Sequence, residues 1–315
     1  MELNFNAVTT PLRSAATVML LRDTLKGLEI FLLKRHGLSD VLGGAYVFPG
    51  GKVDGADAEL DAVAHLDQAP PVLHDSLNEP DIDAATACGL YVAAIREAFE
   101  ECGILFAHGA TREHATQAHT LLREGYAFDE VLAQMQLRLQ TQSLAPWSRW
   151  ITPRVPSVMN KRFDTRFFVA ACPADQTAQH DNHEATESLW ITPRAALEQY
   201  RSGQIELAPP QIMSLAHLSR MGTVQAVMTE ARSRLPAVIN PEPFDEDGSR
   251  VICYPGDARH SVQVRVMPGP PACATSTSGL SPPTDLTRCF SSRCATKNQP
   301  LLAIPSRSIV AFSVA

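Results

Sequence analysis

The chain has 315 residues, 45% of them hydrophobic, which is enough to build the core of one large globular domain or two small ones. Its formal net charge of −7 argues against a sequence-independent grip on DNA or RNA, because that grip requires a basic surface, so a nucleic acid polymer is not expected as a partner. No apolar run approaches the roughly 18 residues of a membrane span, and residues 1–14 lack a basic stretch followed by an apolar one; we therefore expect a cytoplasmic protein without a membrane partner.

Short apolar segments near the N-terminus predict a β-hairpin. The apolar runs SAATVMLL and LEIFLLKR are separated by the polar, glycine-containing sequence RDTLKG, so strands are expected at about 14–22 and 28–35. The sequence AYVFPGG, residues 45–51, then predicts a third strand that ends at a proline-glycine break. Residues 58–83 are acidic, contain prolines and have no lysine or arginine, so we expect a surface excursion with little packed core.

The middle of the chain alternates between helical and extended patterns. Residues 84–103 and 110–142 have helical periodicity. Three strands are expected at 147–153, 162–172 and 187–193, followed by helices at 193–203, where Gly203 is the stop signal, at 209–221 and at 223–235. This mixed order without an internal repeat favours an α/β fold built as a layered α/β/α sandwich.

The composition changes after about Met267. Residues 267–315 are rich in serine, threonine and proline, hold one acidic residue, Asp285, and show no sustained periodicity. This pattern predicts a disordered tail. The alternative is that a shifted reading frame has replaced a native C-terminus, because the change in composition is abrupt.

Three glutamates gather in REAFEECGI, residues 96–104. At about 100° per residue, Glu97, Glu100 and Glu101 share one helix face, while Ile95 and Phe99 lie on the opposite, apolar face. Such like charges destabilise a helix by roughly 0.2–0.5 kcal/mol per pair. Arg96 is expected to pair with Glu100. A solvated acidic face is one interpretation; a site for Mg²⁺ or Mn²⁺, which prefer hard oxygen ligands, is the other.

A glycine pair lies upstream, in FPGGKVD. Gly50 and Gly51 follow a predicted strand and a proline, so they permit a tight turn and a close approach of the backbone to a ligand. A plain turn would have the same sequence. A Walker A loop is excluded because no Gly-Lys-Ser/Thr follows at the required spacing.

Together, the two segments resemble the Nudix box, G-x5-E-x7-R-E-U-x-E-E-x-G-U, where U is a bulky aliphatic residue. Gly51 matches the opening glycine, and the closing half is matched by Arg96, Glu97, Glu100, Glu101, Gly103 and Ile104. Asp57 replaces the mid-box glutamate and Ala98 a larger aliphatic residue. Asp57 and Arg96 are separated by 38 residues where the box has seven, an extension that costs only about 1.5 kcal/mol of loop-closure entropy.

An interrupted box of this kind is similar to the coenzyme A diphosphatase-like branch of the Nudix superfamily. The resemblance implies a Nudix-type α/β/α sandwich with a mixed β-sheet and extra helices over residues 12–260, with insertions at about 58–83 and 108–142. It also implies Mg²⁺- or Mn²⁺-dependent hydrolysis of a diphosphate linkage in a small nucleotide substrate, with coenzyme A or acyl-CoA favoured. A hydrolase of an ADP-sugar or a dinucleotide, and a non-catalytic nucleotide-binding Nudix module, are the alternatives.

The resemblance also suggests roles for individual residues. Glu97, Glu100 and Glu101 would bind the metal, and Glu97, Glu101 and the loop residue Glu184 would be catalytic, although Glu184 could also be a solvated loop acid. Gly50, Gly51 and Arg166 would bind substrate, although Arg166 could instead form a salt bridge with Asp164. His180 and His183 are expected at the surface, and Trp147, Trp150 and Trp190 in the core or at a rim. The oligomeric state is not predicted.

Overall fold

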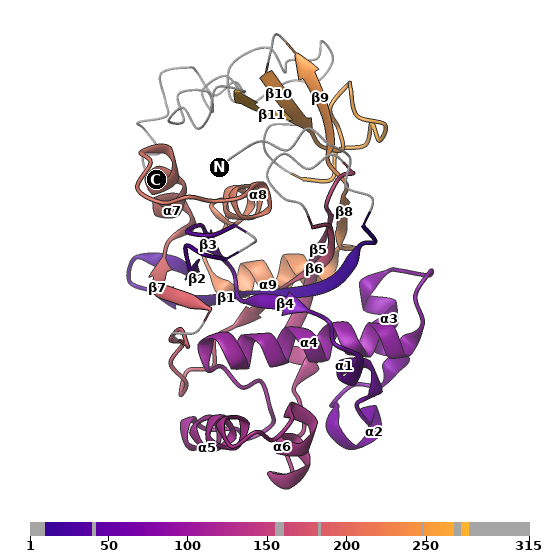
Figure 1. The fold of residues 1–315 in the computed structure, drawn as a ribbon, viewed down its shortest axis with the longest axis vertical. Helices are drawn as coiled ribbons and strands as arrows, with labels where there is room; N and C mark the ends of the chain where they lie inside the picture. The colour runs from indigo at the N-terminus through magenta and orange to yellow at the C-terminus, as the bar shows by residue number, and fades with distance from the viewer. Residues whose placement is uncertain are drawn as a thin grey trace.

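The computed structural model describes residues 10–39, 42–154, 161–181, 184–246, 249–267 and 272–276. Within these residues, an eight-stranded mixed sheet lies between two layers of helices, as the sequence predicted (Figure 1). Its main strand order is β3-β2-β1-β6-β5-β8, with β4 paired to β1 and β7 paired to β2. The strands of this sheet are β1 (Arg13–Thr24), β2 (Gly27–Arg35), β3 (Tyr46–Val47), β4 (Gly50–Lys52), β5 (Leu144–Ile151), β6 (Phe163–Ala171), β7 (Ala185–Ile191) and β8 (Ala237–Ile239).

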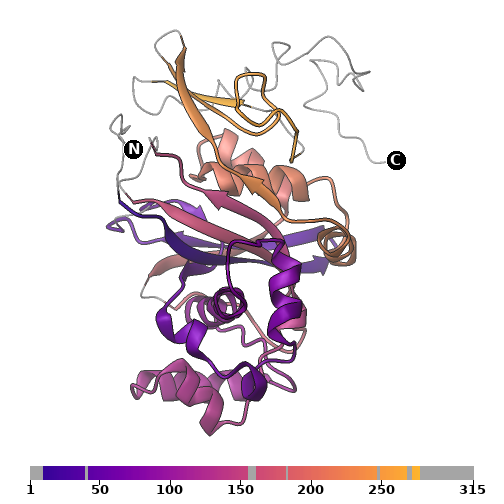
Figure 2. The same ribbon diagram turned by 90° about the vertical axis from the view of Figure 1, so that its right-hand side faces the viewer.

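Helices cover both faces of the sheet, as two views at right angles show (Figures 1 and 2). One layer consists of α1 (Gly55–Glu59), α2 (Ala62–His65), α3 (Pro70–Leu77), α4 (Ala84–Cys102), α5 (Arg112–Arg123) and α6 (Phe128–Gln134). The other consists of α7 (Pro193–Arg201), α8 (Pro209–Leu218) and α9 (Val224–Ser233). A hydrophobic core lies on each face of the sheet, and successive side chains of β1 point alternately into one core and the other. Val18 and Leu20 pack on the α4 side, and Met19 and Leu21 pack on the α7–α9 side.

The predicted hairpin is confirmed, but its two strands separate. Strands β1 and β2 pair antiparallel from Thr24↔Gly27 to Leu21↔Ile30. Beyond this point β1 pairs with β4, at Thr17↔Gly50, whereas β2 pairs with β3. The short glycine-containing strand β4 therefore lies in the opening between β1 and β2, in the middle of the sheet.

Helix α4 is the longest helix in the described residues, and it forms where the periodicity predicts it. The Asp83 side chain caps its N-terminus by accepting a hydrogen bond of 2.7 Å from the Thr86 backbone N–H. Gly103 ends it with a left-handed backbone, φ 73°, which favours glycine. The helix packs on β1 and places its C-terminal half beside β4.

The segment 58–83 differs from its prediction. We expected little packed core, but Leu66, Leu73 and Leu77 are buried in the core cluster on the α4 side. Leu73 and Leu77 are four residues apart and so share one face of α3, which packs on α4. The prolines at the start of α3 occupy its first turn, where they favour a helix, and do not signal a loop.

The helical periodicity over residues 110–142 corresponds to two short helices. These are α5 and α6, and they are followed by a 3-10 turn at Thr141–Ser143. Gly125, with φ 96°, lies between the helices, and a residue with that left-handed backbone interrupts an α-helix.

A second, small sheet follows the main domain. Strands β9 (Glu242–Glu246), β10 (Ser249–Cys253) and β11 (Ala272–Ser276) are antiparallel in the order β11-β10-β9. Strand β11 lies within the segment 267–315, so the expectation of disorder is wrong for its five residues. Residues 268–271 and 277–315 of that segment lie outside the described residues.

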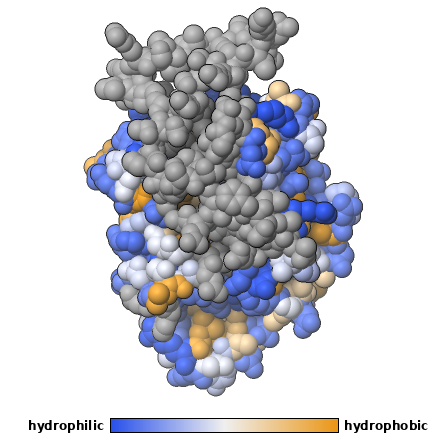
Figure 3. All heavy atoms as spheres, turned by 45° about the horizontal axis from the view of Figure 1, so that its top comes forward, coloured by the Kyte–Doolittle hydropathy of each residue, from blue (hydrophilic) through white to orange (hydrophobic). Residues whose placement is uncertain are grey.

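The face of the molecule drawn in Figure 3 is mostly polar where its residues are coloured. On the face drawn in Figure 3, hydrophobic residues are scattered between hydrophilic ones. Large exposed hydrophobic side chains such as Leu25, Leu38 and Val63 come from separate parts of the chain. None of the helices in the described part of the chain is long and apolar enough to span a membrane.

Candidate active site

The site is built around the two glycines of β4, which bring the backbone against helix α4. A Cβ atom on Gly50 would lie 2.6 Å from the Cα atom of Thr17 and would collide with the carbonyl oxygen of Ala16. A Cβ atom on Gly51 would collide with the carboxylate of Glu97. Gly50 therefore requires glycine for its close approach to the β1 backbone, whereas a side chain at position 51 would displace the Glu97 carboxylate.

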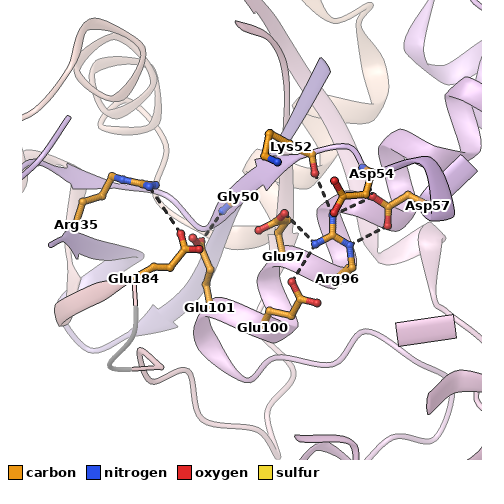
Figure 4. A network of polar contacts seen from close by, with 10 residues as sticks. All are labelled: Arg35, Gly50, Lys52, Asp54, Asp57, Arg96, Glu97, Glu100, Glu101 and Glu184. Carbon is orange, nitrogen blue, oxygen red and sulfur yellow. Dashed lines mark hydrogen bonds and ion pairs between the residues drawn. The ribbon is translucent and has the colours of Figure 1, made fainter. Parts of the chain in front are cut away.

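The glutamates of α4 face this glycine strand and are not a solvated acidic face (Figure 4). The Glu101 carboxylate is buried and accepts a hydrogen bond of 2.8 Å from the backbone N–H of Gly50. Glu97 is also largely buried, beside Gly51. Glu100 is more exposed, with 37% of its side chain accessible to solvent. The structure thus brings Gly50, Gly51, Glu97 and Glu101 together.

Arg96 organises the cluster through more contacts than the predicted pair with Glu100. Its guanidinium group donates to both carboxylate oxygens of Asp57, at 2.8 and 2.9 Å, in a bidentate geometry. It also donates to Glu97 and Glu100, each at 2.9 Å, and to the Lys52 carbonyl oxygen at 3.0 Å. Asp57, which replaces the mid-box glutamate, is therefore in direct contact with the helix despite the interrupting segment.

Glu184 approaches from the loop before β7. Its carboxylate lies 3.7 Å from the guanidinium group of Arg35 on β2, and 64% of its side chain is exposed. Figure 4 shows Glu184 close to Glu101 and on the same side of the glycine strand as Arg35. Because its side chain is exposed, Glu184 is more accessible to solvent than the buried carboxylates on α4.

Burial perturbs the carboxylates on α4. Desolvation raises the pKa of Glu97 to about 7, and repulsion from Glu100 and Glu184 adds to the effect while Arg96 opposes it. Desolvation raises the pKa of Glu101 to about 8, opposed by the Gly50 N–H and increased by Glu97 and Glu184. The pKa of Glu100 is raised for the same first reason. Coupled carboxylates of this kind are typical of functional sites.

The donor set fits a hard divalent cation. No group of three or more histidine, cysteine or acidic side chains in the described ranges could hold a metal ion by itself. However, the nearby charges of Glu100 and Glu184 help to raise the pKa of Glu97, and those of Glu97 and Glu184 help to raise the pKa of Glu101, so these carboxylates lie close together. Carboxylate oxygens are the ligands that Mg²⁺ and Mn²⁺ prefer, and Mg²⁺ usually keeps water and substrate phosphate as its other ligands.

A pocket of about 450 Å³ begins at this cluster and extends over the face of the sheet opposite α4. Glu97 reaches it through the opening between β1 and β2. Basic side chains line it: Arg13, Arg35, Lys52 and Lys161. Aromatic rings also line it: Phe48, Trp150, Phe163, Phe167 and Tyr254. The pocket therefore combines basic and aromatic side chains.

Some of these pocket residues were missed by sequence reasoning. Arg13 and Lys52 had no role assigned, although Arg13, Ala15 and Thr17 alternate along β1, so a period of two would place them on one face. Tyr254 comes from a distant segment, and no local signal connects it with the glycine strand. Trp150 was expected in the core or at a rim, and it is both buried and part of the pocket lining.

Arg166 does not fit the substrate-binding role expected for it. Its guanidinium group is buried and donates to both carboxylate oxygens of Glu79, one of them at 3.0 Å from Nε. It also lies 3.1 Å from Asp164, the salt bridge that was the alternative. His180 and Ser188 share a hydrogen bond of 2.9 Å between Nδ1 and Oγ. His183 lies outside the described residues, so its predicted position at the surface stays a prediction.

We predict that Gly51→Ala lowers any catalytic activity of this site about a hundredfold while leaving the fold intact. The added methyl group would displace the Glu97 carboxylate, and a misplacement of about 1 Å in a catalytic group can cost that much. Steady-state kinetics and a thermal melt would measure both effects. Gly55→Ala is the matched control, because a Cβ atom there meets nothing within 4 Å. Equal activity in the two variants would contradict the prediction.

We also predict a pH-dependent stability without divalent cations. Below the unfolded-state pKa of about 4.5 Glu101 is protonated in both states, whereas between that value and about 8 only the folded state keeps the proton. Its contribution to the free energy of unfolding therefore falls across this window. Glutamine does not titrate, so Glu101→Gln lacks this pH dependence. The free energy of unfolding of the variant, minus that of the parent protein, should therefore increase from pH 5 to pH 8 and then level off. Urea denaturation in EDTA at several pH values tests this; a constant difference would contradict it.

Comparisons with known proteins agree with this geometry. A family model described as the NUDT19 Nudix domain matches residues 9–218. The chain is 28% identical over 231 residues to the acyl-coenzyme A diphosphatase NUDT19 of Xenopus laevis, a match that covers 62% of this chain and 61% of that protein. It is 27% identical over 254 residues to the putative nudix hydrolase 7 of Caenorhabditis elegans, covering 79% of this chain and 75% of that protein.

A solved structure shares the fold. The crystal structure of a NUDIX hydrolase from Alicyclobacillus acidocaldarius superposes with a TM-score of 0.57 and 27% sequence identity. The match covers 72% of this chain and 98% of that one. The chain spans about three fifths of the length of the Xenopus laevis relative, so the match concerns the domain that carries the glycine strand and α4.

Proposed function

The chain belongs to the NUDT19 Nudix domain family, and on that premise we propose that it hydrolyses the diphosphate linkage of a nucleoside-diphosphate derivative, with coenzyme A or an acyl-CoA as the substrate. One observation carries the proposal: Glu97 and Glu101 are held against Gly50 and Gly51, and Glu97 and both glycines line the pocket. The names of the relatives that are acyl-coenzyme A diphosphatases support the choice of substrate.

Glu97 and Glu101 would hold a Mg²⁺ or Mn²⁺ ion, with Glu100 close to them on α4. When bound, the cation would supply positive charge to the diphosphate oxygens and increase the acidity of water. Arg96 keeps Glu97 and Glu100 in place through hydrogen bonds of 2.9 Å. Because these carboxylates have raised pKa values, binding of the cation would release protons from them near neutral pH.

The remaining residues would act on the substrate and on the proton. The Glu184 carboxylate would accept a proton from the attacking water, and Arg35, 3.7 Å away, would orient it. Arg13 and Lys52 would offset the negative charge of the phosphates where they line the pocket. The Gly50 and Gly51 backbone would allow the diphosphate to approach closely.

The proposal is tested by incubating the purified full chain with coenzyme A, an acyl-CoA, ADP-ribose, NADH and diadenosine polyphosphates, in Mg²⁺, Mn²⁺ or EDTA. We expect the highest kcat/KM for coenzyme A or its ester, and no turnover in EDTA. Turnover of only ADP-ribose or a dinucleotide would contradict coenzyme A as the substrate but would agree with hydrolysis of a diphosphate linkage. A chain that binds a nucleotide without hydrolysing any of these compounds would be a non-catalytic module.

A further inference from the structure

A second pocket, of about 710 Å³, lies at the C-terminal ends of helices α8 and α9 and takes no part in the proposed function. Its charged or titratable lining side chains are His217, Arg220, Glu230, Arg234 and Arg265. None of these five lines the pocket at the glycine strand. All lining residues of the second pocket except His217 follow residue 218, where the family match ends. The second pocket is therefore built by the C-terminal part of the described chain.

Arg234 is held in a fixed position at the second pocket. Its guanidinium group lies over the ring of Trp147, 4.4 Å from the ring centroid. It also donates through Nη1 to the carbonyl oxygens of Trp147 and Leu235, at 3.1 and 3.3 Å. Trp147 belongs to β5 and is fully buried, so it is a firm support. A planar guanidinium group that is already ordered loses little conformational freedom when it binds an anion.

Positive charge exceeds negative charge around the second pocket. The carboxylate of Glu230 is already paired, 2.7 Å from Nε2 of His217 and 3.5 Å from Nε of Arg234. Arg220 is exposed, and it forms no ion pair with an acidic side chain in the part of the chain that the structure describes. Nε of Arg265 donates to the carbonyl oxygen of Met267 at 3.2 Å. Three arginines that surround one glutamate create a local field that attracts anions.

The rest of the lining is apolar. Met221, Val266 and Met267 line the second pocket and belong to the core cluster on the α7–α9 side or pack against it. A small inorganic ion gains nothing from such a surface, whereas a hydrocarbon group gains free energy when it leaves water to lie there. The second pocket therefore places apolar surface directly beside its arginines.

We propose that the second pocket binds an organic anion, whose phosphate or carboxylate group pairs with Arg220 and Arg234 and whose hydrocarbon part lies on the three apolar side chains. A guanidinium group matches both anions because its N–H donors can bind two oxygens at once. The two pockets share no lining residue, so the inference goes beyond the proposed function and does not depend on it.

Four small ligands test which chemistry the second pocket selects. Calorimetry on the full chain, in EDTA, would measure the binding of hexyl phosphate, hexanoate, inorganic phosphate and hexanol. We expect the tighter of the two hexyl anions to bind about tenfold more tightly than inorganic phosphate, because its hydrocarbon part is buried, and hexanol to bind least. The ratio between hexyl phosphate and hexanoate identifies the anionic group. Hexanol or inorganic phosphate that binds as tightly as both hexyl anions would overturn the inference.

Variants locate the binding. Arg220→Gln should weaken the tighter hexyl anion about tenfold, because a neutral amide cannot replace the charged hydrogen bonds. Arg232→Gln is the matched control: Arg232 is an exposed arginine on α9 that does not line the second pocket, so this variant should bind as the parent does.

A variant of the other pocket excludes binding at the glycine strand. Lys52 lines that pocket, and Lys52→Gln should not change the affinity for the hexyl anion. Weaker binding to Lys52→Gln with unchanged binding to Arg220→Gln would place the anion in the other pocket and overturn the inference. No binding to the parent protein, or equal binding to the parent and Arg220→Gln, would also overturn it. Hydrolysis of coenzyme A decides the proposed function separately.

Discussion

Replacing Glu101 with glutamine should lower the hydrolysis of coenzyme A roughly a thousandfold while leaving the fold intact and the metal-free protein at least as stable as the parent. The Glu101 side chain accepts a hydrogen bond from the Gly50 N–H, and the carbonyl oxygen of a glutamine can accept the same bond. The amide is a poor ligand for a hard dication, so the charge of the diphosphate would not be neutralised. Steady-state kinetics with Mg²⁺ and thermal melts with and without Mg²⁺ measure the two effects.

The controls separate the metal role from a structural one. Glu97→Gln should also abolish turnover, whereas Glu113→Gln, on α5, should change neither turnover nor the melting temperature. Mg²⁺ should raise the melting temperature of the parent protein by mass action, and it should do so much less for Glu101→Gln. Full turnover in Glu101→Gln would contradict a role of Glu101 in metal binding and would indicate a purely structural role.

The largest expected effect on stability comes from Glu79, at the end of the interrupting segment. Glu79 is buried and binds two arginines on neighbouring strands, Arg149 at 2.9 Å and Arg166 at 2.5 Å. Glu79→Ala would remove the carboxylate that accepts two hydrogen bonds from the buried Arg166 guanidinium and leave Asp164 at 3.1 Å, so we expect a loss of about 3–5 kcal/mol in the free energy of unfolding. Urea denaturation measures this loss.

An exposed ion pair is the matched control for Glu79. Glu187 lies 3.4 Å from Lys34 on the protein surface, and both side chains are solvated. Glu187→Ala should therefore cost less than about 1 kcal/mol. If both variants lose the same small free energy of unfolding, the contacts of Glu79 with Arg149 and Arg166 do not stabilise the fold, and the prediction is wrong.

The sequence predicts best those features that depend on near neighbours. Strands 14–22 and 28–35 and the helix at 84–103 follow from local periodicity, and the structure confirms them. The same reasoning failed where composition was given more weight than spacing. In α3, Leu73 and Leu77 are four residues apart, which is a helical signal, but the acidic and proline-rich context favoured a loop.

Contacts between distant segments could not be predicted in the same way. A helical wheel shows that Glu97, Glu100 and Glu101 share a direction, but it does not show that β4 lies in that direction. The bidentate contact between Asp57 and Arg96 spans 39 positions, and the buried contact between Glu79 and Arg166 spans 87. Because no local rule links such residues, the substrate-binding role of Arg166 remained as plausible as a salt bridge until the fold was known.

The central claim is that this site cleaves a diphosphate linkage, and product analysis tests it most directly. Purified full chain would be incubated with coenzyme A in Mg²⁺, with EDTA and with Glu101→Gln as parallel samples, and the phosphorus-containing products would be separated and identified by mass spectrometry. We predict stoichiometric adenosine 3′,5′-bisphosphate and 4′-phosphopantetheine from the parent protein in Mg²⁺ and neither product in the other samples. Intact coenzyme A in all samples, or equal product from Glu101→Gln, would contradict the account.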